Sequence, residues 1–182
     1  MCLYLVALQA LLGILIACTR ATVHPGWTEP VDPVTDRLVA EVERTLGYEL
    51  PRAYVALMRF QNGGIPKKTC HRSPARTTWA EDHVALHGIS AIGTKKRYSL
   101  CGQTGSSFWI EEWGYPAIGI YFADCPSAGH DMFCLDYRDR AAGSEPRVVH
   151  VDQEWDYKIT VIADSFEDFI RGLEHEDAFP AV

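Results

Sequence analysis

The residues best suited to chemistry lie in one segment, YFADCPSAGHDMFCLDYR, at positions 121–138. A thiol hydrolase would need Cys125, His130 and Asp131 within hydrogen-bond reach, with a thiol of lowered pKa and an oxyanion pocket. A metal site would instead use oxygen and imidazole ligands around the same hairpin. The candidate ligands are Asp124, His130, Asp131 and Asp136.

A turn explains the same segment with fewer assumptions. The connection DCPSAGH, residues 124–130, is rich in Asp, Pro, Ser and Gly, the residue types that turns require. The ordered oxygen ligands of a calcium loop are missing. We therefore interpret the segment as an acidic turn between two strands, with no catalytic residue, no metal ligand and no cofactor.

The cysteines give no metal or redox motif either. Six are present, none in a C-x-x-C pair, so neither a zinc ribbon nor a dithiol site is indicated. Reduced thiols in a cytosol fit best. In an exported chain, Cys70, Cys101, Cys125 and Cys134 would allow two bridges in three connectivities.

Two helices are predicted ahead of the strands. The first follows Asp32 and Pro33, has apolar residues four apart from Val34 to Leu46, and ends at Gly47. The second begins at Leu50-Pro51 and stops at Asn62-Gly63-Gly64. Residues 66–82 show no periodicity and predict a loop.

Short apolar or alternating runs then predict strands, and a last helix begins at Ser165. The predicted strands are residues 84–92, 117–123, 130–137 and 146–152. Strands and helices do not alternate strictly. The order favours an α+β fold with an antiparallel sheet of about five or six strands and helices packed on one side.

The first 30 residues differ from the rest. Residues 1–18 are almost wholly apolar and precede a Pro-rich linker, so we assign 1–30 as a hydrophobic leader and linker and 31–182 as one domain. Leu15-Ile16-Ala17-Cys18 is similar to a lipobox, which would make Cys18 a lipidation site. No basic residue precedes the apolar run, unlike a normal secretory signal. A cytoplasmic protein is the main expectation, and an exported or membrane-anchored one is the alternative.

Charge is distributed unevenly along the chain. The net charge is −7, and residues 101–182 hold 16 Asp and Glu against 5 Lys and Arg. Such a field repels phosphate backbones and attracts basic proteins, so nucleic acid is not expected as a direct ligand.

Trp109, Trp113 and Tyr115 flank Glu111 and Glu112 in the segment GQTGSSFWIEEWGYP, residues 102–116. It lacks the order of a phosphate-binding loop, but exposed rings beside carboxylates suit a protein interface. An equally open alternative is that the rings fill the core. The predicted partner-binding residues are Glu111, Glu112, Trp113, Asp124 and Asp131.

Three segments taken in order carry a family resemblance: LGYELPRAYVALMRFQNGG, YPAIGIYFADCPSAGHDMFCLDYR and RVVHVDQEWDYKITVIADSFEDFIRGL. The chain from about Val31 to Leu173 resembles the SUKH superfamily of Smi/Knr-like domains. The resemblance implies an α+β domain without catalytic residues, as in fungal cell-wall regulators and bacterial immunity proteins that neutralise a cognate toxin, often a nuclease. It carries over no active site.

Three functions are therefore expected in order. The first is a non-enzymatic immunity protein that binds a cognate polymorphic toxin. The second is a membrane-tethered, lipoprotein-like interaction or cell-wall regulatory module that uses the same domain. The third is a metal-dependent or thiol enzyme built on the hairpin of residues 121–138.

Overall fold

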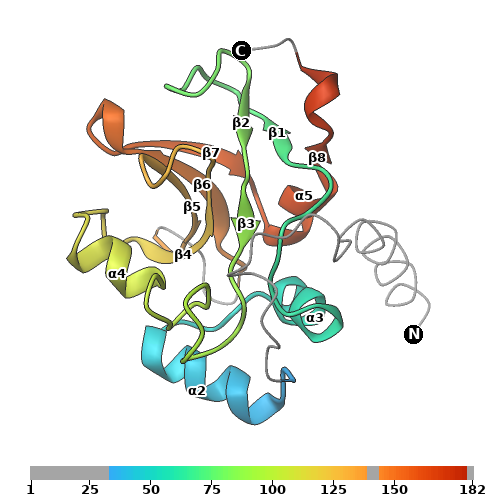
Figure 1. Cartoon of the computed structure of the whole chain (residues 1–182), viewed down its shortest axis with the longest axis vertical. Helices are drawn as coiled ribbons and strands as arrows, with labels where there is room; N and C mark the ends of the chain where they lie inside the picture. The colour runs from blue at the N-terminus through green and yellow to red at the C-terminus, as the bar shows by residue number, and fades with distance from the viewer. Residues whose placement is uncertain (1–32, 139–143, 180–182) are drawn as a thin grey trace.

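In the computed structural model, residues 33–138 and 144–179 are described. They form four α-helices, eight strands and two short 3-10 helices, which confirms the predicted α+β class (Figure 1). The helices are α2 (Asp36–Leu46), α3 (Arg52–Phe60), α4 (Ser106–Glu111) and α5 (Phe166–Arg171). The leader and Cys18 lie outside the described residues. Among the described residues, no helix is long and apolar enough to cross a membrane.

The main sheet is antiparallel and has five strands in the order β3-β4-β5-β6-β7. They are β3 (Gly88–Ile89), β4 (Gly119–Asp124), β5 (Asp131–Asp136), β6 (Arg147–Asp152) and β7 (Lys158–Ala163). Three of the predicted strands become β4, β5 and β6 with bounds shifted by one or two residues. The fourth, residues 84–92, is divided between β3 and a strand of a second sheet, and β7 was not predicted.

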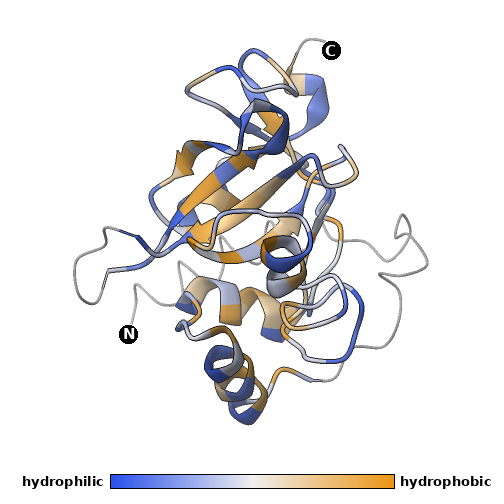
Figure 2. Ribbon diagram, turned by 90° about the vertical axis from the view of Figure 1, so that its left-hand side faces the viewer, coloured by the Kyte–Doolittle hydropathy of each residue, from blue (hydrophilic) through white to orange (hydrophobic). Residues whose placement is uncertain are grey.

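One face of this sheet carries the larger hydrophobic core. Helices α2, α3 and α5 supply Val42, Tyr54 and Phe169, which pack with Phe122 and Phe133 from the sheet. All five side chains are fully buried, and each large buried side chain contributes about 1.5–3 kcal/mol of transfer free energy. Figure 2 shows hydrophobic residues along the strands and mixed colouring on α2, the lowest helix in that view, as expected of an amphipathic helix.

Helix α4 covers the opposite face, so the helices do not all lie on one side as the sequence predicted. Its Trp109 and Ile110 pack with Tyr121 and Val149 in a second, smaller core. Ser106 fixes the start of this helix, because its hydroxyl oxygen accepts a hydrogen bond from the buried backbone N–H of Tyr121 (3.0 Å). The helix has six residues, which is too few for a long periodic pattern, and its Trp109 packs in the core on this face of the sheet.

The helix ends follow local rules. Helix α2 is capped by Thr35 instead of the predicted Asp32, while Gly47 takes the predicted left-handed conformation with φ of 77°. Ser165 caps α5 as predicted, because its side chain accepts a hydrogen bond from the Asp168 N–H.

Asn62, just after α3, joins this helix to the chain near the sheet. Its side-chain amide donates to the Ile92 carbonyl (2.9 Å) and its side-chain oxygen accepts from the Ile92 N–H (2.7 Å). The next residue, Gly63, donates its N–H to Met58 Sδ (3.1 Å). The Asn62 side chain therefore satisfies both backbone hydrogen-bonding groups of Ile92, as a neighbouring strand would.

A second sheet of three strands, β2-β1-β8, was not predicted. Its strands are β1 (Cys70–Arg72), β2 (His83–Ala85) and β8 (Leu173–Glu174). Strand β1 lies inside the segment predicted as a loop, and it pairs with residues that are distant in the sequence.

Candidate functional site

Two chain connections meet at one end of the main sheet. The turn from β4 to β5 and the connection from β6 to β7 lie together because Asp131 pairs with Asp152 in the sheet register. The 3-10 helix η3 (Gln153–Trp155) opens the second connection. The Gln153 N–H donates to the His130 carbonyl (2.9 Å) and joins the two connections directly.

The C-terminal end of α4 rests on these connections. A Cβ atom added to Gly129 would lie 2.8 Å from Trp109 Cζ3 and 3.2 Å from Trp113 Cη2, so only glycine fits there. The Tyr157 hydroxyl donates to the Trp113 carbonyl (2.5 Å). The Trp113 ring meets the His130 ring edge to face at 6.5 Å. Helix and connections therefore form one packed unit.

Exposed acidic side chains precede Trp113 in the chain and also occur on the β6–β7 connection. We name the set Glu111, Glu112, Trp113, His130, Glu154 and Asp156 the turn-end surface. Its four carboxylates are exposed, and no described Lys or Arg forms an ion pair with them. Glu154 instead contacts His130, with 2.5 Å between Oε1 and Nδ1. The surface thus presents negative charge that no Lys or Arg in the described part of the chain neutralises.

Backbone strain is concentrated at the same end of the sheet. Three non-glycine residues in the described chain have positive φ: Ala128 (59°), Asp156 (54°) and Tyr157 (56°). Ala128 belongs to the β4–β5 turn and the other two to the β6–β7 connection. Such conformations cost on the order of 1–3 kcal/mol each and cluster at functional sites. Packing against α4 and the hydrogen bond from the Tyr157 hydroxyl to the Trp113 carbonyl stabilise these strained conformations.

The predicted partner-binding residues differ in how far their side chains are exposed to solvent. Glu111 and Glu112 are exposed and Trp113 is half-buried, as an interface requires. Asp124 is 25% exposed, and its Oδ2 contacts His87 Nδ1 (3.1 Å). Asp131 is only 2% exposed and faces the interior, so its assignment to a partner surface is corrected. The alternation of β5 explains this, because Asp131 shares a face with the core residues Phe133 and Leu135.

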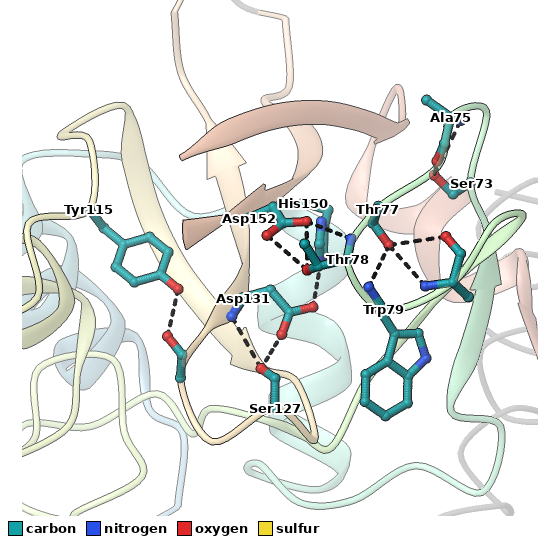
Figure 3. Close-up of polar contacts among 12 residues, drawn as sticks. Ser73, Ala75, Thr77, Thr78, Trp79, Tyr115, Ser127, Asp131, His150 and Asp152 are labelled. Carbon is teal, nitrogen blue, oxygen red and sulfur yellow. Dashed lines mark hydrogen bonds and ion pairs between the residues drawn. The ribbon is translucent and has the colours of Figure 1, made fainter. Parts of the chain in front are cut away.

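The predicted hydrolase set does not assemble. His130 is exposed and bonded to Glu154, whereas His150 of β6 bonds to Asp131, with 2.6 Å between Nε2 and Oδ2 (Figure 3). Burial, followed by the charge of Asp131, raises the pKa of the Cys125 thiol well above its ordinary value. The thiol therefore stays protonated at neutral pH, which is the opposite of what nucleophilic catalysis requires.

The predicted metal ligands are also dispersed. Asp136 lies at the far end of β5 and pairs with Arg138, with 2.9 Å between Oδ2 and Nη2. Asp124 contacts His87, and His130 contacts Glu154. His150 was missed by sequence reasoning because it stands in an apolar alternating run, RVVHVD. The signal available in the sequence was a titratable side chain within a run of valines that predicts a buried strand.

Comparison with known families gives one match. Residues 33–172 match the SMI1 / KNR4 family (SUKH-1). This range contains the turn-end surface and all strands of the main sheet. A search of curated proteins found no match.

Proposed function

Because the chain belongs to the SMI1 / KNR4 family (SUKH-1), we propose that it is a non-enzymatic immunity protein that binds and neutralises a cognate toxin. The family fits an immunity or regulatory domain. The finer assignment rests on the turn-end surface, which joins exposed carboxylates to a half-buried tryptophan on strained connections.

Electrostatics indicates the kind of partner. The turn-end surface has four exposed carboxylates, and complementary charge raises association rates above those of neutral surfaces. A basic cleft, such as the substrate site of a nuclease, is the complementary surface. Trp113 supplies the aromatic anchor that interface centres favour.

The test is co-expression with the toxin encoded beside this gene. We expect protection of the host and a complex that survives gel filtration. The double variant Glu111→Lys with Glu112→Lys should slow association about tenfold or more at low salt, because it reverses charge at the proposed contact. Killing in the presence of the wild-type chain, without a complex, would refute the function.

A matched control separates local charge from net charge. Glu145 and Asp164 are exposed, and they flank β6 and β7 at the opposite end of the sheet. Reversing both to Lys changes the net charge equally. We expect nearly wild-type association, and an equal loss in both double variants would contradict the turn-end surface as the contact.

The membrane-tethered regulatory module remains the second proposal, supported by the apolar leader and the sequence Leu15-Ile16-Ala17-Cys18. Cell fractionation tests it. An acylated Cys18 would place the protein in the membrane fraction, and Cys18→Ser would release it. Equal distribution of the two proteins would refute tethering through this residue.

A further inference from the structure

Three buried side chains with different metal-binding atoms converge at the same end of the main sheet as the turn-end surface. Cys125 follows β4, Asp131 begins β5 and His150 lies within β6. One donor atom of each lies within 4.8 Å of the other two. Exposed fractions are 2%, 2% and 0%. The sheet register produces this convergence, because His150 pairs with Phe133 and is thus a diagonal neighbour of Asp131 on one face.

The charge of this cluster is not balanced by a permanent cation. Asp131 and Asp152 are cross-strand partners and both are buried. Neither forms an ion pair with a Lys or Arg among the described residues. Thr78 donates its N–H and hydroxyl to Asp152 (2.9 Å each), and His150 contacts Asp131 (Figure 3). Buried carboxylates are costly unless hydrogen bonds and opposite charge compensate them.

We propose that Cys125, Asp131 and His150 form a binding site for a zinc ion. Thiolate, imidazole and carboxylate are the ligands that Zn²⁺ takes in proteins, whereas Ca²⁺ and Mg²⁺ prefer oxygen alone. Binding would displace the proton of the Cys125 thiol into solvent, and the ring proton of His150 would move from Nε2 to Nδ1, so that the three ligands become thiolate, neutral imidazole and carboxylate.

The observed geometry requires only a small adjustment. With metal–ligand distances of about 2.0–2.3 Å, ligand atoms in a tetrahedral site lie about 3.3–3.7 Å apart. The His150 Nε2 to Asp131 Oδ2 distance of 2.6 Å therefore opens when the proton is replaced. Asp152 is the cross-strand partner of Asp131 and is a further buried carboxylate at this end of the sheet.

Supporting hydrogen bonds already orient the carboxylate ligand. Ser127 donates its hydroxyl to Asp131 Oδ1 and accepts from the Asp131 N–H (3.1 Å). The Tyr115 hydroxyl donates to the Gly129 carbonyl (2.7 Å) and holds the turn that carries Ser127. Contacts of this kind fix ligand orientation in metal sites. The ion would cross-link the β4–β5 turn to β5 and β6.

The experiment titrates the full-length, metal-free chain with Co²⁺ and then with Zn²⁺. We expect one Co²⁺ per chain, with the visible bands of tetrahedral cobalt and a thiolate charge-transfer band that Zn²⁺ abolishes. Zn²⁺ should also raise the midpoint of thermal unfolding, because it binds the native state. A wild-type titration without a thiolate band would overturn the proposal.

Variants locate the site. Cys125→Ser should remove the charge-transfer band, and His150→Gln should weaken Co²⁺ binding at least tenfold. Cys134→Ser is the matched control, since Cys134 is buried in β5 but packs in the smaller core on the other face. If Cys125→Ser does not fold, a chain with the other five cysteines changed to Ser replaces it. Loss of the band in that chain, or its retention in folded Cys125→Ser, would refute the site.

Discussion

Gly129 makes the packing of α4 against the β4–β5 turn directly measurable. We predict that Gly129→Ala lowers the free energy of unfolding by about 2–5 kcal/mol. A left-handed conformation costs an L-residue about 1–2 kcal/mol, and Gly129 has φ of 100°. The new Cβ would also lie 2.8 Å from Trp109 Cζ3, and overpacking of this kind costs about 1–3 kcal/mol more.

Gly47 provides the control, because it also has a positive φ but lacks the contact. Its φ is 77°, and an added Cβ would meet nothing within 4 Å. Gly47→Ala should therefore cost only the conformational part, about 1–2 kcal/mol. Urea unfolding followed by tryptophan fluorescence measures both variants. If the two losses agree within about 0.5 kcal/mol, the close packing between the turn and Trp109 is refuted.

Three further predictions concern other parts of the fold. Ser106→Ala should cost about 1–3 kcal/mol in urea unfolding, because it leaves the buried Tyr121 N–H without its acceptor; an unchanged midpoint would refute that role. Burial lowers the pKa of His71, so the unfolded chain binds its proton more readily and stability falls as pH drops below about 6.5. His71→Gln should reduce the loss of unfolding free energy below this pH. If the free energy of unfolding has the same pH slope in the variant and the wild-type chain, the prediction is contradicted. Burial raises the pKa of Cys101 to about 11, so peptide mapping should show slow alkylation near neutral pH that accelerates as pH approaches this value, unlike a thiol of ordinary pKa.

The fold was predictable where local pattern and tertiary packing agree. Gly47 and Ser165 mark helix ends through backbone conformation and side-chain capping, which are local properties. Strand β7 was missed although Ile159, Thr160, Val161 and Ile162 are β-branched and favour strands. The second sheet was beyond such reasoning, because its strands have two or three residues and pair across long separations.

The site was predictable only in part. Glu111, Glu112 and Trp113 were predicted as partner-binding residues because acid beside aromatic residues is visible in the sequence, and this assignment stays a prediction. Glu111 and Glu112 are exposed and Trp113 is half-buried. The partnership of Asp131 with His150 depends on the register of β5 against β6, which the sequence does not state. Sequence proximity favoured His130, whereas the sheet brings in a histidine 19 residues away from Asp131.

The hydrogen bonds between Asn62 and Ile92 also affect how readily Asn62 deamidates. Deamidation of an Asn-Gly pair requires the glycine nitrogen to attack the side-chain carbonyl carbon, and both groups are held here by bonds to Met58 and Ile92. Spontaneous damage must therefore proceed through locally opened states. The aspartate that forms has no amide hydrogen to offer the Ile92 carbonyl, so a deamidated chain lacks one of these hydrogen bonds and opens more easily at this point.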